Sequence, residues 1–158
     1  MSLIEFVDEF IETNGSIYKG EMLGSIKHGN GILKWPDGSV YEGQFKNNKT
    51  NGKGKIIYSE KDYYEGDWVN DNAEGFGIYQ HENGSRYEGQ WKEDKQHGNG
   101  NEIFPDGAAY QGDYKDGFKH GKGLFKWNDG TSYEGEFFEN NLEGSGKYMW
   151  PNGRIYIG

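Results

Sequence analysis

The sequence predicts an all-β protein, built as a single-layer, elongated antiparallel sheet of consecutive β-hairpins. Three observations support this: a Tyr-x-Gly motif that recurs every 23 residues, glycines at fixed places within that period, and turn signals once per period. Aromatic residues make up 16% of the 158-residue chain and glycine accounts for 27 positions, whereas aliphatic side chains are scarce. Disordered chains are poor in aromatics, so regularly spaced rings indicate a folded repeat protein.

Each repeat starts at a tyrosine, here called position 0, with glycine at position 2. A ring or methionine follows at position 4, a Gly-x-Gly pair at positions 11 and 13, and in most repeats a ring at position 17 and a glycine at position 20. This pattern accounts for every glycine except Gly24 and Gly117. We expect residues 1–13 to form an N-terminal cap or partial repeat and residues 14–158 to form the array. Its repeats start at Tyr18, Tyr41, Tyr64, Tyr87, Tyr110 and Tyr133, with a partial unit at Tyr156.

The turn signals set the strand register. Trp35-Pro36-Asp37-Gly38-Ser39 has Pro and Asp where a type I turn favours them, then Gly at the left-handed position of a three-residue hairpin loop. That loop places Leu33 opposite Tyr41 and Gly31 opposite Gly43. Because side chains alternate between the faces of a strand, rings and glycines gather on one face and mostly polar residues on the other. We expect the glycine pairs to leave a trough in which flanking rings lie flat, since no second layer is encoded.

One hairpin departs from the pattern. Ser59-Glu60-Lys61-Asp62 lacks the turn glycine, so Lys61 is expected in a left-handed conformation at a cost of about 1 kcal/mol. We expect this hairpin to be the weakest of the array.

The two ends leave alternatives open. Leu3, Val7, Phe10 and Ile11 have helical spacing, so Ser2–Ile11 could form a short capping helix, with Ser2 and Glu5 as a capping box. Phe10 and Ile11 could equally belong to a strand. Tyr156-Ile157-Gly158 starts a seventh repeat, which suggests a fragment of a longer protein and an open sheet edge.

The residues that first suggest chemistry fit the period instead. His28, His97 and His120 occupy one repeat position, about 10 Å apart in neighbouring repeats, which is too far for shared zinc ligation. We interpret them as loop residues before the first glycine, and His81 as a packed imidazole. Glu42, Glu65, Glu88 and Glu134 form a column that a solvated strand face explains. Cysteine is absent. We therefore expect no catalytic residues, no metal site and no cofactor.

The net charge is −9 and the pI is near 4.9, which disfavours nucleic acid and anionic lipid as partners. Lysines nevertheless cluster around two strand connections. The candidates for anionic-lipid contact are Lys46, Lys49, Lys53, Lys115, Lys119 and Lys122. No apolar run is long enough to span a membrane and the N-terminus is acidic, so we expect a cytoplasmic protein, with association with the cytoskeleton or a membrane as a second expectation.

The motif Tyr-Glu-Gly-Gln-Trp-x6-Gly-x-Gly at Tyr87–Gly100, and its equivalents at Tyr64 and Tyr133, resemble the MORN (membrane occupation and recognition nexus) repeat. The resemblance covers nearly the whole chain and implies an all-β hairpin array. MORN arrays occur in junctional and cytoskeletal proteins and beside catalytic domains such as phosphatidylinositol-phosphate kinases. The resemblance implies scaffolding, dimerisation or lipid binding, with no catalysis by the repeats themselves.

We therefore expect a non-catalytic interaction scaffold or adaptor that presents its aromatic–glycine face to an apolar peptide or helix, or that self-associates through a terminal repeat. The alternative is a targeting or regulatory region of a larger membrane-associated enzyme, such as a phosphatidylinositol-phosphate kinase, with weak phospholipid binding. The proposed binding rings are Trp35, Tyr41, Trp68, Tyr87, Trp91, Tyr110, Trp127, Tyr133 and Trp150.

Overall fold

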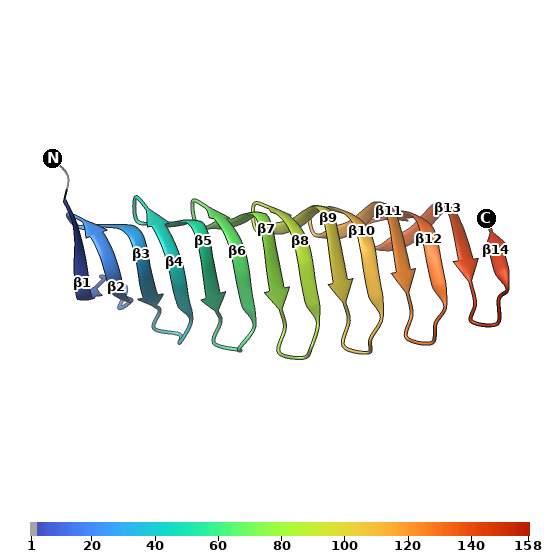
Figure 1. Cartoon of the computed structure of the whole chain (residues 1–158), viewed down its shortest axis with the longest axis horizontal. Coiled ribbons are helices and arrows are strands. Elements are labelled where there is room, and N and C mark those ends of the chain that lie inside the picture. Colours follow the sequence, from blue (N-terminus) through green and yellow to red (C-terminus); the bar gives the residue numbers. More distant parts are fainter. Residues whose placement is uncertain (1–2) are drawn as a thin grey trace. The chain divides into compact units, whose positions relative to one another are not determined.

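The computed structural model describes residues 3–158, and in this part of the chain all regular structure is β-strand (Figure 1). Two compact units divide the chain after Glu82. The first unit contains β1 (Ile4–Ile11), β2 (Ile17–Leu23), β3 (Ile26–Lys34), β4 (Val40–Lys46), β5 (Lys49–Ile57), β6 (Tyr63–Val69) and β7 (Asn72–Gln80). The second contains β8 (Arg86–Lys92), β9 (Lys95–Ile103), β10 (Ala109–Lys115), β11 (Phe118–Lys126), β12 (Ser132–Phe138), β13 (Asn141–Met149) and β14 (Ile155–Ile157).

Within each unit, every strand pairs antiparallel with the strand that follows it in the chain. The predicted all-β sheet of consecutive hairpins is therefore confirmed. The predicted register is also found, because Leu33 pairs with Tyr41 and Gly31 with Gly43. The Trp35 N–H donates to the Ser39 carbonyl at 2.9 Å, which closes the loop as expected.

The prediction of a short N-terminal helix is wrong. Ile4–Ile11 forms strand β1, which pairs with β2 from Ile4 opposite Leu23 to Ile11 opposite Ile17. The edge of β2 offers a full row of backbone donors and acceptors, and this outweighs the helical spacing of four apolar residues. Ser2, half of the expected capping box, lies outside the described residues.

A second kind of turn joins the two strands of each repeat from Tyr41 onward. Asn47 and Asn48 both have positive φ, 50° and 71°, as a two-residue type I′ turn requires. A β-bulge follows in the same strand pair, where the register shifts between Gly43 and Phe45. Equivalent bulges lie between β2 and β3, β6 and β7, β8 and β9, β10 and β11, and β12 and β13.

Candidate interaction face

Position-0 tyrosines form the floor of the ring face. Tyr110 is 1% exposed, and its ring lies across the backbone of Gly112 and Gly123, which pair with each other. Its phenol donates to the carbonyl of Asp113 at 2.8 Å, so the buried hydroxyl is satisfied. The same hydroxyl-to-carbonyl bond, three residues along the chain, is made by Tyr18, Tyr41, Tyr64, Tyr87 and Tyr133. The expected glycine trough, with rings lying flat in it, is therefore present.

The rings at position 4 connect these tyrosines. Tyr110 contacts Tyr114 of its own repeat and Phe137 of the next one edge to face, at centroid distances of 5.2 and 5.1 Å. Tyr114 in turn contacts Tyr87 at 5.1 Å, and Phe137 contacts Tyr133 at 5.3 Å. The first unit contains the same arrangement through Tyr18, Phe45, Tyr41, Trp68 and Tyr64. Each such pair is worth about 1 kcal/mol beyond burial, so this spine takes the place of a two-layer core.

Burial controls the chemistry of these phenols. Desolvation, with a smaller contribution from the nearby Glu21 carboxylate, raises the pKa of Tyr18 to about 12. Burial likewise raises the pKa of Tyr41, Tyr87 and Tyr110, and burial beside Glu102 raises that of Tyr114. These tyrosines are therefore protonated at neutral pH, where they can donate hydrogen bonds but cannot act as phenolate nucleophiles.

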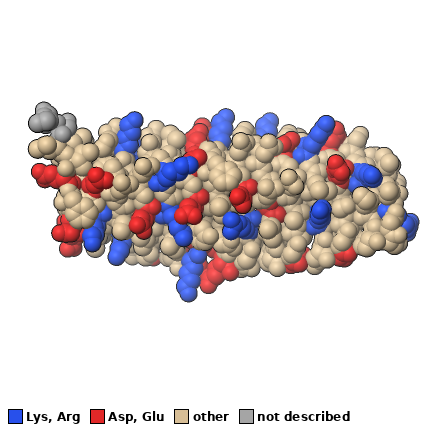
Figure 2. All heavy atoms as spheres, in the orientation of Figure 1, with Lys and Arg blue, Asp and Glu red and all other residues tan. Residues whose placement is uncertain are grey.

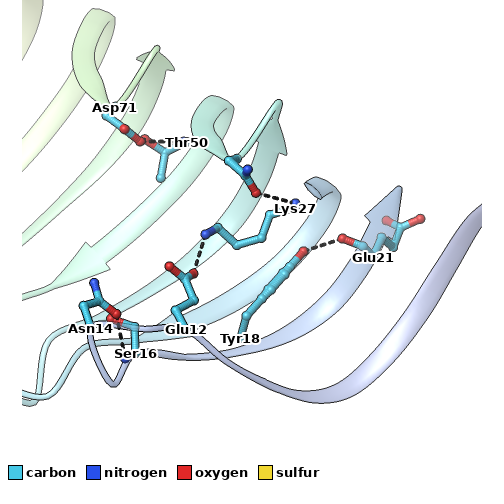
Figure 3. A network of polar contacts seen from close by, with 9 residues as sticks. Glu12, Asn14, Ser16, Tyr18, Glu21, Lys27, Thr50 and Asp71 are labelled. Carbon is cyan, nitrogen blue, oxygen red and sulfur yellow. Dashed lines mark hydrogen bonds and ion pairs between the residues drawn. The ribbon is translucent and has the colours of Figure 1, made fainter. Parts of the chain in front are cut away.

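Neighbouring repeats are linked at the type I′ turns by a reciprocal hydrogen-bond pair. Asn48 donates its backbone N–H to the Lys27 carbonyl at 3.0 Å, while its side-chain oxygen accepts the Lys27 N–H at 2.8 Å. Asp71 makes the same two bonds to Thr50 (Figure 3), and Asn140 makes them to Lys119. Sequence reasoning missed this role, although the recurrence of Asn or Asp at position 7 is a readable signal.

A second hydrogen bond fixes the bulge in each repeat. The side chain at position 3 accepts the backbone N–H at position 12, as Gln44 does from Lys53 at 2.8 Å. The other acceptors are Glu21, Asp67, Gln90, Asp113 and Glu136. This column was not predicted, although it is visible in the sequence as an unbroken series of Gln, Glu and Asp at position 3.

A partly buried ion pair lies on the ring face near the N-terminus. Lys27 is 7% exposed, and its ammonium pairs with the Glu12 carboxylate beside Tyr18 (Figure 3). Ser16 is fully buried nearby, with its N–H bonded to the Asn14 side chain at 2.9 Å. Glu12 occupies a position where most repeats have a ring, so this end of the face is ionic rather than aromatic.

Rings at positions 15 and 17 form the accessible part of the face in the second unit. They follow one another as Phe104, Phe125, Trp127, Tyr148 and Trp150, here called the ring ladder. The four successive centroid distances are 5.7, 4.8, 6.3 and 6.0 Å. Trp127 and Tyr148 are nearly parallel at 13°, and Tyr148 and Trp150 at 22°. Four of the five are half-buried, and Trp150 is 37% exposed. The ladder therefore offers apolar surface that the buried spine does not.

The first unit has a more polar counterpart. Tyr58 stacks on Tyr79 at 6.2 Å, and Tyr79 contacts the His81 ring at 4.6 Å. The Asp62 carboxylate accepts the Tyr79 hydroxyl at 3.2 Å and faces His81 Nδ1 at 3.1 Å. A backbone hydrogen bond from Glu82, together with Tyr79 and His81, holds the pKa of Asp62 below its usual range despite some desolvation. His81 does pack against a ring, but it is also half-exposed and paired with an acid.

The nine rings proposed from the sequence fall into two groups. Five are buried in the spine and present almost no surface: Tyr41, Trp68, Tyr87, Tyr110 and Tyr133. Four are accessible: Trp35, Trp91 and Trp127 are half-buried, and Trp150 is exposed. Phe104 at position 17, and Phe125 and Tyr148 at position 15, were not predicted, because the prediction favoured tryptophans and position-0 tyrosines. Binding by any of these residues stays a prediction.

The proposed lysine contacts do not share one face. Lys119 lies on the ring face, with its ammonium 5.1 Å from the centroid of Phe104 and 5.5 Å from that of Tyr110. Lys115 and Lys122 alternate with ring-face residues and lie on the opposite face. Lys53 pairs with Asp67, and Lys46 lies directly opposite Lys49 across a type I′ turn.

The histidines proposed as loop residues are in strands instead. His28 lies in β3, His97 in β9 and His120 in β11, because pairing continues through the glycine bulges. Between residues 3 and 158, no three His, Cys, Asp or Glu side chains are grouped as metal ligands would be. A helix long and apolar enough to cross a membrane is likewise not found in the described part of the chain.

Comparison with known proteins identifies the repeat. The MORN repeat model matches six consecutive segments, at residues 18–40, 41–63, 64–86, 87–109, 110–132 and 133–153. Comparison with curated protein sequences finds no match.

Solved structures with the same fold include the SAS-4 (dCPAP) TCP domain of Drosophila melanogaster, in complex with a proline-rich motif of Ana2 (dSTIL). It has 15% sequence identity and a TM-score of 0.59, with 99% of this chain and 88% of that chain covered. The G-box domain of the microcephaly protein CPAP has 11% identity and a TM-score of 0.51, covering 100% and 98%. At these identities the likeness concerns the fold.

Proposed function

Because this chain belongs to the MORN repeat family, we propose that it is a non-catalytic protein-interaction module that holds a partner against its ring face. The ring ladder is the observation that carries this proposal. It places five contacting rings on one accessible surface, and such apolar rows on a folded protein are typical of interaction sites. The Drosophila domain of similar fold binds a proline-rich motif, which supports an extended peptide as the partner.

The polar groups on the face do not favour catalysis. Tyr79, Asp62 and His81 form the arrangement most like a catalytic triad, but burial and the Asp62 carboxylate raise the pKa of Tyr79 to about 12. Its hydroxyl donates to the Asp62 carboxylate, whose lowered pKa makes it a weak base toward a phenol of raised pKa. A structural role for this cluster, in a hairpin that lacks its turn glycine, accounts for the ring stacking and the Asp62 hydrogen bonds.

Partner capture with matched variants tests the proposal. The immobilised chain is compared with Trp127→Ala and Trp150→Ala, and with the control Phe138→Ala, a ring 48% exposed on the opposite face of the same unit. A partner held by the ring face is recovered by the unaltered chain and by Phe138→Ala, and its recovery falls with both ladder variants. The captured partner is then purified and its binding is measured directly. Equal binding to all four proteins would exclude the ring face as the site.

A second candidate is phospholipid binding, as in a targeting or regulatory region of a membrane-associated enzyme. Its support is the pairing of Lys46 with Lys49 and of Lys92 with Lys95, two cations directly opposite each other at type I′ turns. Against it, basic and acidic side chains are intermingled on the face shown in Figure 2. Sedimentation with vesicles containing phosphatidylinositol phosphates tests it: binding should fall with salt and with charge reversal at Lys46 and Lys49.

A further inference from the structure

Building on the proposed function, we propose that the ring ladder of the second unit binds a polyproline II peptide. The peptide lies across β9, β11 and β13, has proline at every third residue and basic side chains between the prolines. One proline contacts each repeat, next to Phe104, Trp127 and Trp150 in turn. This identifies the partner by its backbone conformation, its three-residue period and its charge.

The spacing of the rings matches one turn of a polyproline II helix. Position-17 rings recur once per hairpin repeat, and two strands at about 4.8 Å give about 9.6 Å between equivalent positions. A polyproline II helix advances about 3.1 Å per residue with three residues per turn, or about 9.3 Å per turn. Over the two intervals from Phe104 to Trp150, the accumulated mismatch is therefore about 0.6 Å. Each turn of such a peptide thus meets an equivalent ring.

Other peptide conformations fit less well. In an extended strand, side chains alternate, so residues three apart point to opposite sides and only every second proline could face the ladder. In an α-helix, a seven-residue step covers about 10.5 Å, which accumulates about 1.8 Å of mismatch over the same two intervals. A preformed polyproline II segment also loses little conformational entropy when it binds.

The ring ladder also has the chemistry that proline-rich segments bind. Trp127, Tyr148 and Trp150 are nearly parallel, at 13° and 22°, so they form a continuous apolar wall rather than isolated contacts. Aromatic walls of this kind are the usual surface on which proline-rich segments dock. Proline carries no N–H and needs no backbone partner from the protein, and the central strands of this sheet have none to offer because their backbones are already paired.

Two carboxylates beside the ring ladder favour a basic peptide. The loops that follow Phe104 and Trp127 contain the exposed carboxylates Asp106 and Asp129, one per repeat and in step with the rings. A hydrogen bond from the Thr131 backbone N–H holds the pKa of Asp129 below its usual range, so it is ionised at neutral pH. The loop side is therefore acidic beside Phe104 and Trp127, where basic residues of the peptide would face Asp106 and Asp129. The third loop has Asn152 at the equivalent place, and the guanidinium of Arg154 lies 5.5 Å from the Trp150 centroid. The Lys119 ammonium lies 5.1 Å from the Phe104 centroid.

Fluorescence anisotropy with labelled synthetic peptides and the full chain tests this. The first peptide repeats Pro-Ala-Arg four times, with three residues per turn. The second repeats Pro-Ala-Ala-Arg four times, which keeps the number of prolines and arginines but places proline at every fourth residue. The third replaces Arg by Glu in the first peptide, and the fourth is a helix-forming peptide with leucine at every seventh position. We expect the first peptide to bind about tenfold more tightly than the second and the third. Trp127→Ala should weaken it about tenfold, and Phe138→Ala should leave it unchanged.

The outcomes separate this inference from the proposed function. Equal affinity for the three- and four-residue spacings, tighter binding of the Glu or helical peptide, or no binding of any peptide overturns the polyproline assignment. The fate of the proposed function is decided separately, by whether partner capture depends on Trp127 and Trp150. The comparison of spacings uses the unaltered chain, so it holds even if Trp127→Ala does not fold.

Discussion

The ring of Tyr110 occupies the space that a side chain at residue 123 would need. A Cβ built on Gly123 would lie 2.5 Å from both Cε2 and the hydroxyl oxygen of Tyr110, far inside van der Waals contact. The glycine is therefore required by the ring, and the ring is held in turn by its hydrogen bond to Asp113.

Gly123→Ala should destabilise the chain by about 3 kcal/mol, since the ring must leave its trough to admit the methyl group. Urea unfolding followed by far-UV circular dichroism measures this. Gly117→Ala is the control, because a Cβ there meets nothing within 4 Å and only its φ of 89° is unfavourable. A cost no larger than that of the control would contradict the steric role of Tyr110.

Gly117→Asn should stabilise the second unit by about 1 kcal/mol. Gly117 already donates its N–H to the Gln96 carbonyl at 2.9 Å, as Asn48 does to Lys27, but it has no side chain to accept the returning N–H. Asparagine tolerates the positive φ and supplies that acceptor. Thermal unfolding shows a raised midpoint if this is correct, and Gly117→Leu, which lacks the acceptor, should not reproduce it.

Lys61→Gly should stabilise the first unit by about 1 kcal/mol. Lys61 has a φ of 75° at the place where other loops have glycine, which confirms the expected left-handed conformation. Differential scanning calorimetry of the variant tests whether this hairpin is the weak one. Lys61→Ala is the control for charge, because it removes the ammonium but keeps a non-glycine residue at positive φ. This variant should therefore not raise the unfolding temperature of the first unit.

Alkaline unfolding should be cooperative between pH 10 and about 12. Unfolded tyrosine releases its proton near pH 10, whereas burial raises the pKa of Tyr18 and Tyr79 to about 12. Above pH 10 the unfolded state therefore binds fewer protons than the folded state, and the free energy of unfolding falls as pH rises. Phenolate absorbance and circular dichroism should change together. Phenolate formation near pH 10, with the sheet intact, would contradict the burial of these rings.

The fold was largely predictable because its period is readable in single residues. Gly31 and Gly43 pair as the turn at Pro36 and Asp37 requires. The helix expected near the N-terminus failed because spacing within Ile4–Ile11 is local information, whereas the open edge of β2 is not. The accessible rings were harder to predict than the buried ones, since Tyr110 and Trp127 are both regularly spaced aromatics. Tyr110 is buried because its ring lies in the glycine trough, whereas Trp127 stays accessible. The alternation of side chains along a strand places both rings on the same face and cannot distinguish the two cases.

The reciprocal bonds of Asn48 with Lys27 and of Asp71 with Thr50 have an evolutionary consequence. Each bond joins residues 21 positions apart, so a copied segment of one whole period arrives with its acceptors, bulges and ring contacts already in phase. Insertion of a single residue would instead shift the strand register of that hairpin and move its side chains to the opposite face. Duplication of whole repeats therefore lengthens this array without disrupting its contacts, whereas the insertion of one residue at a time disrupts them.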